Sequence, residues 1–171
     1  MRSLRAAALL SAFLCASCGY HTAGSANLLP KSIHTIAIPQ WANATTQYKL
    51  STYMSAALSR ELIGRTSYTI VADPAKADAT IYGSLVNVFQ NATVYDPTTG
   101  RGTGAQLIVQ INIRMIGKDG KVLFTRPNME FRDRYEISVD PRQYIDESQS
   151  TLTRLSKDVA RSVVSAILSD F

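Results

Sequence analysis

The two cysteines of this chain, Cys15 and Cys18, have the spacing C-x-x-C. In a folded protein this spacing supports redox chemistry or metal binding, because neighbouring groups lower a thiol pKa or complete a ligand set. Here the pair follows Arg2, Arg5 and a short apolar run over residues 6–14. That order is typical of a secretory signal, which offers neither condition.

The residues around the pair, Leu14-Cys15-Ala16-Ser17-Cys18, resemble a lipobox, with cleavage after Ser17 and acylation of the Cys18 sulfur. We therefore predict a lipoprotein signal peptide over residues 1–17 and a lipidated tether over residues 18–31. Gly19 favours transport to the outer membrane, since Asp at this place is typical of lipoproteins kept in the inner membrane. We expect a lipid-anchored protein on the periplasmic side. The alternative is a plain secretory signal with an incidental cysteine.

The remaining residues offer no recognisable catalytic constellation. Catalysis would require a nucleophile beside a base, paired carboxylates or a metal cluster. His21 falls in the predicted tether and His34 in a predicted strand, without triad or ligand spacing. Acids gather before and within the last predicted helix, where those near its N-terminus complement the helix dipole; they are Asp133, Glu136, Asp140, Asp146 and Glu147. We expect no enzyme, no cofactor and no metal.

Residues 100–104, Gly-Arg-Gly-Thr-Gly, have some similarity to a phosphate-binding loop. They lack the G-x-x-x-x-G-K-[ST] spacing and no helix is expected after them, so a hairpin tip is the favoured interpretation. Arg101 at such a tip is still suited to an anionic partner. The formal net charge of +5 includes Arg2 and Arg5 of the signal. The rest is only mildly basic, which does not favour a nucleic-acid partner.

Length and composition, 171 residues with 46% hydrophobic and 18% charged, indicate one globular domain after the tether. Hydrophobic periodicity predicts two helices, from 48 to 63 and from between 141 and 144 to about 168. Thr45 or Thr46 is expected to cap the first helix, Gly64 to end it, and Asp140 to cap the second. The predicted strands cover residues 33–38, 68–71, 79–95, 106–116, 121–126 and 129–137. Lys118-Asp119-Gly120 marks a hairpin, and Pro127-Asn128 a bulge or an edge kink.

The order of these elements predicts an α+β fold, with two helices packed on one face of a mixed, mainly antiparallel four- to five-stranded sheet. In the segment 106–116, apolar residues alternate with residues that include Gln110, Asn112 and Arg114 and no acid. The preceding strand adds uncharged polar residues, which do not all point the same way: Asn87, Gln90, Asn91 and Thr93. A solvated sheet face and a face that meets a polar protein wall both explain this pattern.

Taken together, a series of short motifs resembles the LptE family of lipopolysaccharide-assembly lipoproteins over nearly the whole chain after residue 17. The resemblance rests on Cys18-Gly19-Tyr20-His21, Ile36-Ala37-Ile38-Pro39, Trp41, Asn43, Thr45, Arg65-Thr66, Tyr68, Ala77-Asp78-Ala79, Ile81, Gly83 and Tyr135. It implies an LptE-like domain over residues 32–171 that plugs a large outer-membrane β-barrel, an LptD-like lipopolysaccharide-assembly protein, and helps it insert lipopolysaccharide into the outer leaflet.

The resemblance also implies basic residues near the strand loops that contact lipopolysaccharide. The nearest positions are Arg101 in the long hairpin and Arg142 before the last helix, followed by Lys118 and Lys121 at the next hairpin. Solvated loop charge is the alternative for all four. The alternative function is that of an outer-membrane lipoprotein that activates a periplasmic peptidoglycan synthase, because a lipidated, non-catalytic α+β domain suits that role equally well.

The predicted anchor is testable at one sulfur. In cells, Cys18→Ala is expected to abolish acylation, because it removes the sulfur that carries the acyl chains. Mass spectrometry of the wild-type N-terminal peptide should find acyl chains on Cys18. An unmodified sulfur in a wild-type protein that fractionates free of membranes would contradict the prediction.

Overall fold

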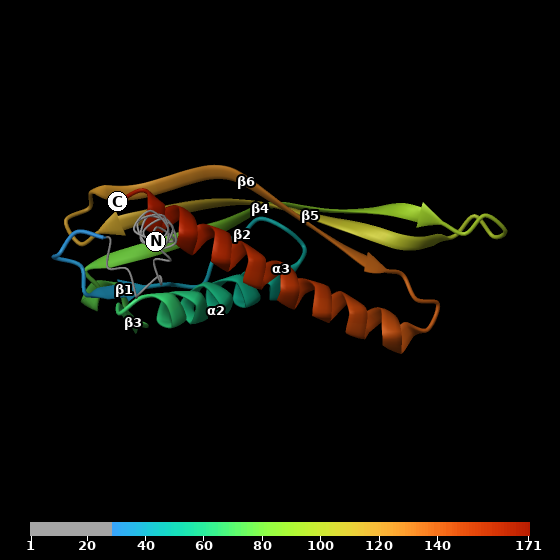
Figure 1. Ribbon diagram of the computed structural model, residues 1–171, viewed down its shortest axis with the longest axis horizontal. Helices are drawn as coiled ribbons and strands as arrows, with labels where there is room; N and C mark the ends of the chain where they lie inside the picture. The colour runs from blue at the N-terminus through green and yellow to red at the C-terminus, as the bar shows by residue number, and fades with distance from the viewer. Residues whose placement is uncertain (1–28) are drawn as a thin grey trace, which may run out of the picture.

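A long, twisted hairpin forms the middle of the sheet in the computed structural model, which describes residues 29–171, with the backbone alone at residues 141 and 143–147. Cys18, the signal peptide and most of the tether lie outside this range. In chain order the elements are β1 (Thr35–Ala37), β2 (Ala42–Asn43), α2 (Tyr48–Arg65), β3 (Thr69–Val71), the 3-10 turn η2 (Pro74–Lys76), β4 (Ala79–Tyr95), β5 (Gly102–Gly117), β6 (Val122–Glu136) and α3 (Pro141–Ser169). Both helices lie on one face of the sheet (Figure 1).

The sheet has six strands in the order β3-β1-β4-β5-β6, with the two-residue β2 beside β4. The short strands β1, β2 and β3 pair in parallel, whereas the long strands β4, β5 and β6 pair antiparallel. This confirms the predicted α+β class and the mixed sheet. The strand that sequence patterning missed is β2, which is too short to show a period.

The core lies between the sheet and the helices. On β5 the side chains of Leu107, Val109, Ile111, Ile113 and Met115 are all buried, as their alternation predicts. They pack in one hydrophobic cluster with residues of both helices, among them Leu58 of α2 and Val163 of α3. Because successive side chains of a strand point to opposite faces, the residues between these apolar ones point away from the helices.

The ends of α2 differ from the sequence prediction. The N-cap residue is Gln47, with no side-chain cap, so capping by Thr45 or Thr46 is wrong. The Thr45 hydroxyl instead accepts from the Gln47 amide at 3.2 Å, in a turn that precedes the helix. Gly64 does not end the helix, which continues to Arg65. The chain leaves it at Thr66, whose hydroxyl donates to the Leu62 carbonyl at 2.6 Å.

The cap of α3 and the bulge of β6 were predicted correctly. The Asp140 carboxylate accepts from the Arg142 amide at 2.9 Å at the start of α3. The β5–β6 register shifts between Ile111 and Ile113, opposite Pro127-Asn128, and Asn128 has a φ of 53°. The two predicted segments are nevertheless one strand, β6, because this edge strand accommodates the bulge without a break.

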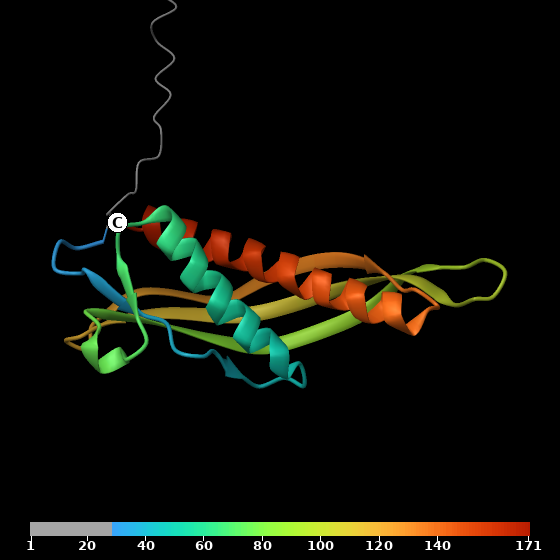
Figure 2. The same cartoon turned by 90° about the horizontal axis from the view of Figure 1, so that it is seen from below.

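The two helices lie side by side and are joined near their C-terminal ends (Figure 2). There the Arg65 guanidinium of α2 donates to the Ser165 hydroxyl of α3 at 2.7 Å. Farther along α3, the Arg154 guanidinium lies 3.4 Å from the Asp133 carboxylate of β6 and donates to the Arg134 carbonyl at 3.3 Å. These contacts hold the helical layer against itself and against the sheet edge.

Trp41 lies in a segment expected to be a loop, yet its side chain is buried. Its indole covers Gly83 of β4 so closely that a Cβ placed there would lie 2.2 Å from ring carbon atoms. Only a residue without a side chain fits beneath the ring, and the contact fixes the β1–β2 connection onto β4.

Asp78 joins the start of β1 to the start of β4. One carboxylate oxygen accepts from the amides of His34 and Thr35, each at 2.9 Å, and from the Thr35 hydroxyl at 2.8 Å. The His34 amide is the strongest of these influences, followed by the Thr35 hydroxyl and amide, and together they lower the pKa of Asp78 from 3.8 to about 2. Nearby, Leu29, in the predicted tether, is buried and donates its amide to the Tyr68 hydroxyl at 3.1 Å.

Gly83→Ala is expected to destabilise the fold by roughly 1–3 kcal/mol, because the added methyl group overlaps the Trp41 ring. Urea unfolding followed by the fluorescence of Trp41, the single tryptophan, measures the change. Gly64→Ala is the matched control: an added Cβ there meets nothing within 4 Å, and alanine suits a helix better, so stability should rise by roughly 0.5–1 kcal/mol. Equal stability of the two variants would contradict the packing described.

Asp78→Asn is expected to lower stability at pH 7 and to weaken its acid dependence. The pKa of Asp78 is lower in the folded protein than in the unfolded chain. Its carboxylate therefore stabilises the fold fully above about pH 3.8, and this stabilisation is lost as the pH falls towards about 2. Urea midpoints from pH 7 down to pH 2, compared between wild type and variant, isolate this contribution from that of other carboxylates. An identical acid-induced loss in both proteins would contradict the role of Asp78.

Candidate docking face

The side of β4 and β5 turned away from the helices is here called the open face. Cross-strand pairs define it: Tyr82 with Arg114, Ser84 with Asn112, Asn87 with Gln110, Phe89 with Ile108 and Asn91 with Gln106. The two strands, Ala79–Tyr95 and Gly102–Gly117, contain a single charged residue, Arg114. Depletion of charge combined with aromatic residues is characteristic of the core of a protein–protein interface.

Large apolar side chains are exposed on β4. Tyr82, Val86 and Phe89 keep 42%, 42% and 45% of their surface accessible, whereas Ile81 and Leu85, on the helix side of the same strand, are buried. A β-bulge lies between Leu85 and Asn87 and shifts the alternation of β4 by one residue. The prediction that the polar residues of β4 do not share one side is correct: Asn87 and Asn91 lie on the open face, whereas Gln90 pairs with Leu107 of the buried set.

Two of the polar residues on β5 hold the neighbouring strand. The Gln110 amide donates to the Glu130 carboxylate at 3.2 Å, and the Asn112 side-chain oxygen accepts from the Asn128 amide at 2.8 Å. The Arg132 guanidinium donates to Glu130 at 2.7 Å. Arg132 first, and Gln110 second, lower the pKa of Glu130. Two of the uncharged polar residues of β5 are thus explained by their hydrogen bonds to β6.

Arg114 lies in an open groove of about 540 Å³ that crosses this face. Its lining includes Pro39 and Gln40 from the β1–β2 connection, Tyr82 of β4, and Thr125 and Pro127 of β6. Arg114 is exposed, and none of the ion pairs or hydrogen bonds found across residues 29–171 involves its guanidinium. The groove therefore offers hydroxyl and amide groups, an aromatic ring and one free cation. The sequence indicated Arg114 only as a polar position and did not predict the groove, because its walls come from four separate segments.

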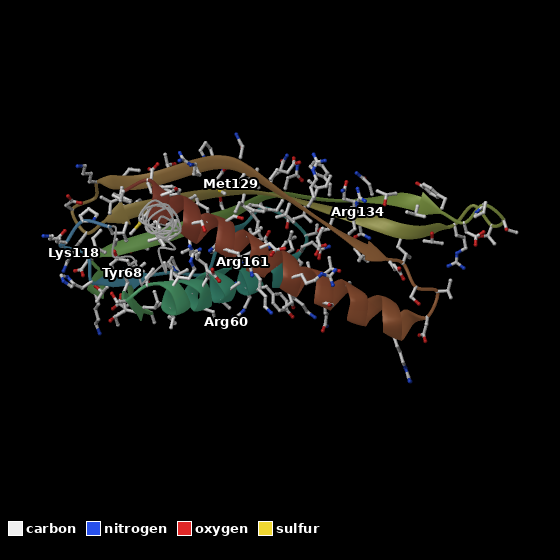
Figure 3. All side chains as sticks on the ribbon, viewed as in Figure 1. Arg60, Tyr68, Lys118, Met129, Arg134 and Arg161 are labelled. Atoms are coloured by element: carbon white, nitrogen blue, oxygen red, sulfur yellow. The ribbon has the colours of Figure 1, made fainter. Side chains whose placement is uncertain are left out.

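The four basic residues predicted to contact lipopolysaccharide do not form one site. Arg101 lies beside the tip of the β4–β5 hairpin, which projects beyond the helices, and the start of α3 with Arg142 lies at the same end of the molecule (Figure 1). Lys118 and Lys121 flank the β5–β6 turn at the opposite end, where Figure 3 labels Lys118. The 16 residues of β5 separate the two groups, a length of about 50 Å at roughly 3.3 Å per residue. All four residues are exposed.

The hairpin tip is closed by its own side chains. The Asp96 carboxylate accepts from the amides of Thr98 at 2.7 Å and Thr99 at 2.8 Å, and these bonds, with Thr99 the larger influence, lower the pKa of Asp96. Gly100 has a φ of 68°, as a tight turn requires. The predicted hairpin tip is confirmed. His34 is exposed, and residues 29–171 show no group of three or more His, Cys, Asp and Glu side chains placed to hold a metal ion.

Comparison with solved structures shows which proteins share this arrangement of two helices and a one-sided sheet. A putative lipoprotein from Caulobacter crescentus matches with a TM-score of 0.56 and 14% identity, over 77% of this chain and 88% of that one. Uncharacterized lipoprotein B from Nitrosomonas europaea matches with a TM-score of 0.52 and 12% identity, over 83% and 91%. A hypothetical protein from Chlamydia trachomatis matches with a TM-score of 0.53 and 11% identity, over 79% and 98%. At these identities the matches define the fold. No curated protein sequence matches the chain.

The fold class is thus one that bacterial lipoproteins use. The family model LptE, described as lipopolysaccharide-assembly, matches residues 33–167, and the chain belongs to this family. Membership confirms the resemblance seen in the sequence and gives the chain a role in lipopolysaccharide assembly. In the described part of the chain, neither helix has the length and apolar character needed to cross a membrane.

Several of the residues that carried the resemblance connect secondary-structure elements or shape turns. Trp41 covers Gly83, and Asp78 ties β1 to β4. The Asn43 side-chain oxygen accepts from the amide and the hydroxyl of Thr45, at 2.8 and 2.7 Å, and shapes the turn before α2. None of these contacts involves the open face directly. The motifs therefore specify how the domain is built, and the docking chemistry lies elsewhere.

Proposed function

We propose that this chain is an outer-membrane lipoprotein that plugs a β-barrel lipopolysaccharide translocon, helps it assemble, and aids lipopolysaccharide insertion into the outer leaflet. The observation that carries the proposal is the open face, which is formed by two long adjacent strands that together contain one charged residue, Arg114. Barrel lumens are lined by polar side chains. A face of amides, hydroxyls and aromatic rings docks on such a wall without the cost of removing many charges from water.

The partner in this proposal is an LptD-like β-barrel of the outer membrane, which the plug contacts through the open face. The chain performs no reaction; its contribution is to occupy and stabilise the lumen. Lipopolysaccharide is the second partner, through its phosphates, which arginine pairs well. Arg101 and Arg142, at the end with the projecting hairpin, are the proposed first contacts, and Lys118 and Lys121 would meet a ligand only at the opposite end. Family membership supports this role over the activation of a peptidoglycan synthase.

The proposed docking face is tested by placing a charge in its middle. Phe89→Glu is expected to leave the fold intact, because Phe89 is exposed on the open face and its cross-strand partner is the uncharged Ile108, and to abolish recovery of the barrel after detergent extraction. A buried, unpaired carboxylate is costly, so at least about a tenfold loss of the complex is expected. Ser162→Glu, at an exposed position of α3, is the matched control and should leave the complex unchanged.

Depletion of the chain provides the test of the function itself. We expect lipopolysaccharide to fail to reach the cell surface and the barrel partner to mature poorly. Normal surface lipopolysaccharide together with normal barrel maturation would overturn the proposal. Recovery of a penicillin-binding protein in place of the barrel would overturn it in favour of the synthase activator.

A further inference from the structure

Arg114 is the one charged residue of β4 and β5, and the charged residues on the same side of β6 lie farther along the sheet, opposite Gln110, Ile108 and Gln106. Its neighbours across the sheet are Tyr82 on one side and Thr125 on the other, and neither is acidic. An acid on the same side of the sheet, Glu130, lies opposite Gln110, four residues and about 13 Å along β5. Glu130 is already bound by Arg132 and Gln110. Arg114 is therefore uncompensated by its surroundings.

Solvent compensates this charge while the face is open, but docking removes the solvent. Burying a guanidinium without an opposite charge carries a large desolvation penalty, enough to prevent an otherwise complementary face from docking. The groove keeps the guanidinium beside hydroxyl and amide groups, which hydrogen-bond well but cannot neutralise a charge. Any partner that covers this face must therefore supply the missing negative charge.

We propose that the protein wall covering the open face presents a side-chain carboxylate that enters the Arg114 groove and forms a bidentate ion pair with its guanidinium. This inference rests on the proposed function, because the wall is that of the barrel partner, and it specifies the chemistry of that wall: uncharged and polar, with one acid opposite Arg114. The planar guanidinium matches a carboxylate through two parallel hydrogen bonds, and the single pair fixes the register of the docked face. Uncharged contacts alone leave that register poorly defined.

The pair is tested by measuring the affinity of purified full-length variants for the purified barrel in detergent. Arg114→Glu is expected to weaken binding at least about tenfold, because it places like charges together in a desolvated site. Arg114→Lys, which keeps the charge but loses the planar fork, should give an intermediate loss. Arg60→Glu is the matched control: Arg60 is exposed on α2, on the helix side of the molecule (Figure 3), and the reversal should change affinity less than twofold.

A zero-length crosslink identifies the acid directly. In the Arg114→Lys complex, a carbodiimide activates the partner carboxylate, and the amine introduced at position 114 attacks it to form an amide. Mass spectrometry is expected to find that amide joining position 114 to one Asp or Glu of the barrel. Arg60→Lys, treated in the same way, should give no such product.

The outcomes separate this inference from the function on which it rests. Wild-type protein that fails to bind the barrel at all overturns the proposed function. Binding by wild type with less than a twofold effect of Arg114→Glu overturns the ion pair and leaves the proposed function standing. Two further results for Arg114→Glu would overturn the proposed partner carboxylate. Weaker binding to lipopolysaccharide vesicles with unchanged affinity for the barrel would assign Arg114 to a phosphate. A changed oligomeric state would assign it to a second copy of this chain.

Discussion

The one-sided burial of β5 determines the rest of this structure. Five large apolar side chains, Leu107, Val109, Ile111, Ile113 and Met115, lie under the helices, and each such burial contributes roughly 1.5–3 kcal/mol. Because side chains on a strand alternate, a slip of one residue would expose all five, so the register is strongly fixed. The same alternation turns Gln106, Ile108, Gln110, Asn112 and Arg114 outward. The open face is therefore a direct consequence of core formation, and its chemistry is set by residues that the core does not use.

A second group of contacts gives the domain its family character. Trp41 on Gly83 and Asp78 on Thr35 connect the N-terminal segments to the long hairpin, and Asn43 on Thr45 shapes the turn before α2. Each depends on a specific side chain or on the absence of one, so each leaves a readable motif. This explains how a chain recognisable as LptE shares its fold with proteins at 11–14% identity.

Sequence patterning predicted what repeats along the chain. The period-two alternation of β5, the Asp140 cap and the Pro127-Asn128 bulge follow from local chemistry, and all are present. The patterning failed at positions next to tertiary contacts: Gly64 precedes Arg65, which still belongs to α2 and donates to Ser165 of α3, and Trp41 is buried because its ring packs on Gly83. The side of the sheet to which Phe89 points could not be predicted from alternation, because the bulge at Val86 shifts the alternation of β4 by one residue. The Arg114 groove combines residues about 75 positions apart in sequence, from Pro39 to Arg114, and no local pattern reports such a surface.

The molecule thus has a helical layer that stabilises the sheet and an open face that is proposed to meet the partner. Site-specific photo-crosslinking in cells tests this division most directly, with a photoreactive phenylalanine analogue at Phe89 on the open face or at Ile63, an exposed residue of α2. The account predicts a strong crosslink from Phe89 to one large outer-membrane protein and a much weaker one from Ile63. A strong crosslink from Ile63 with none from Phe89 would contradict it.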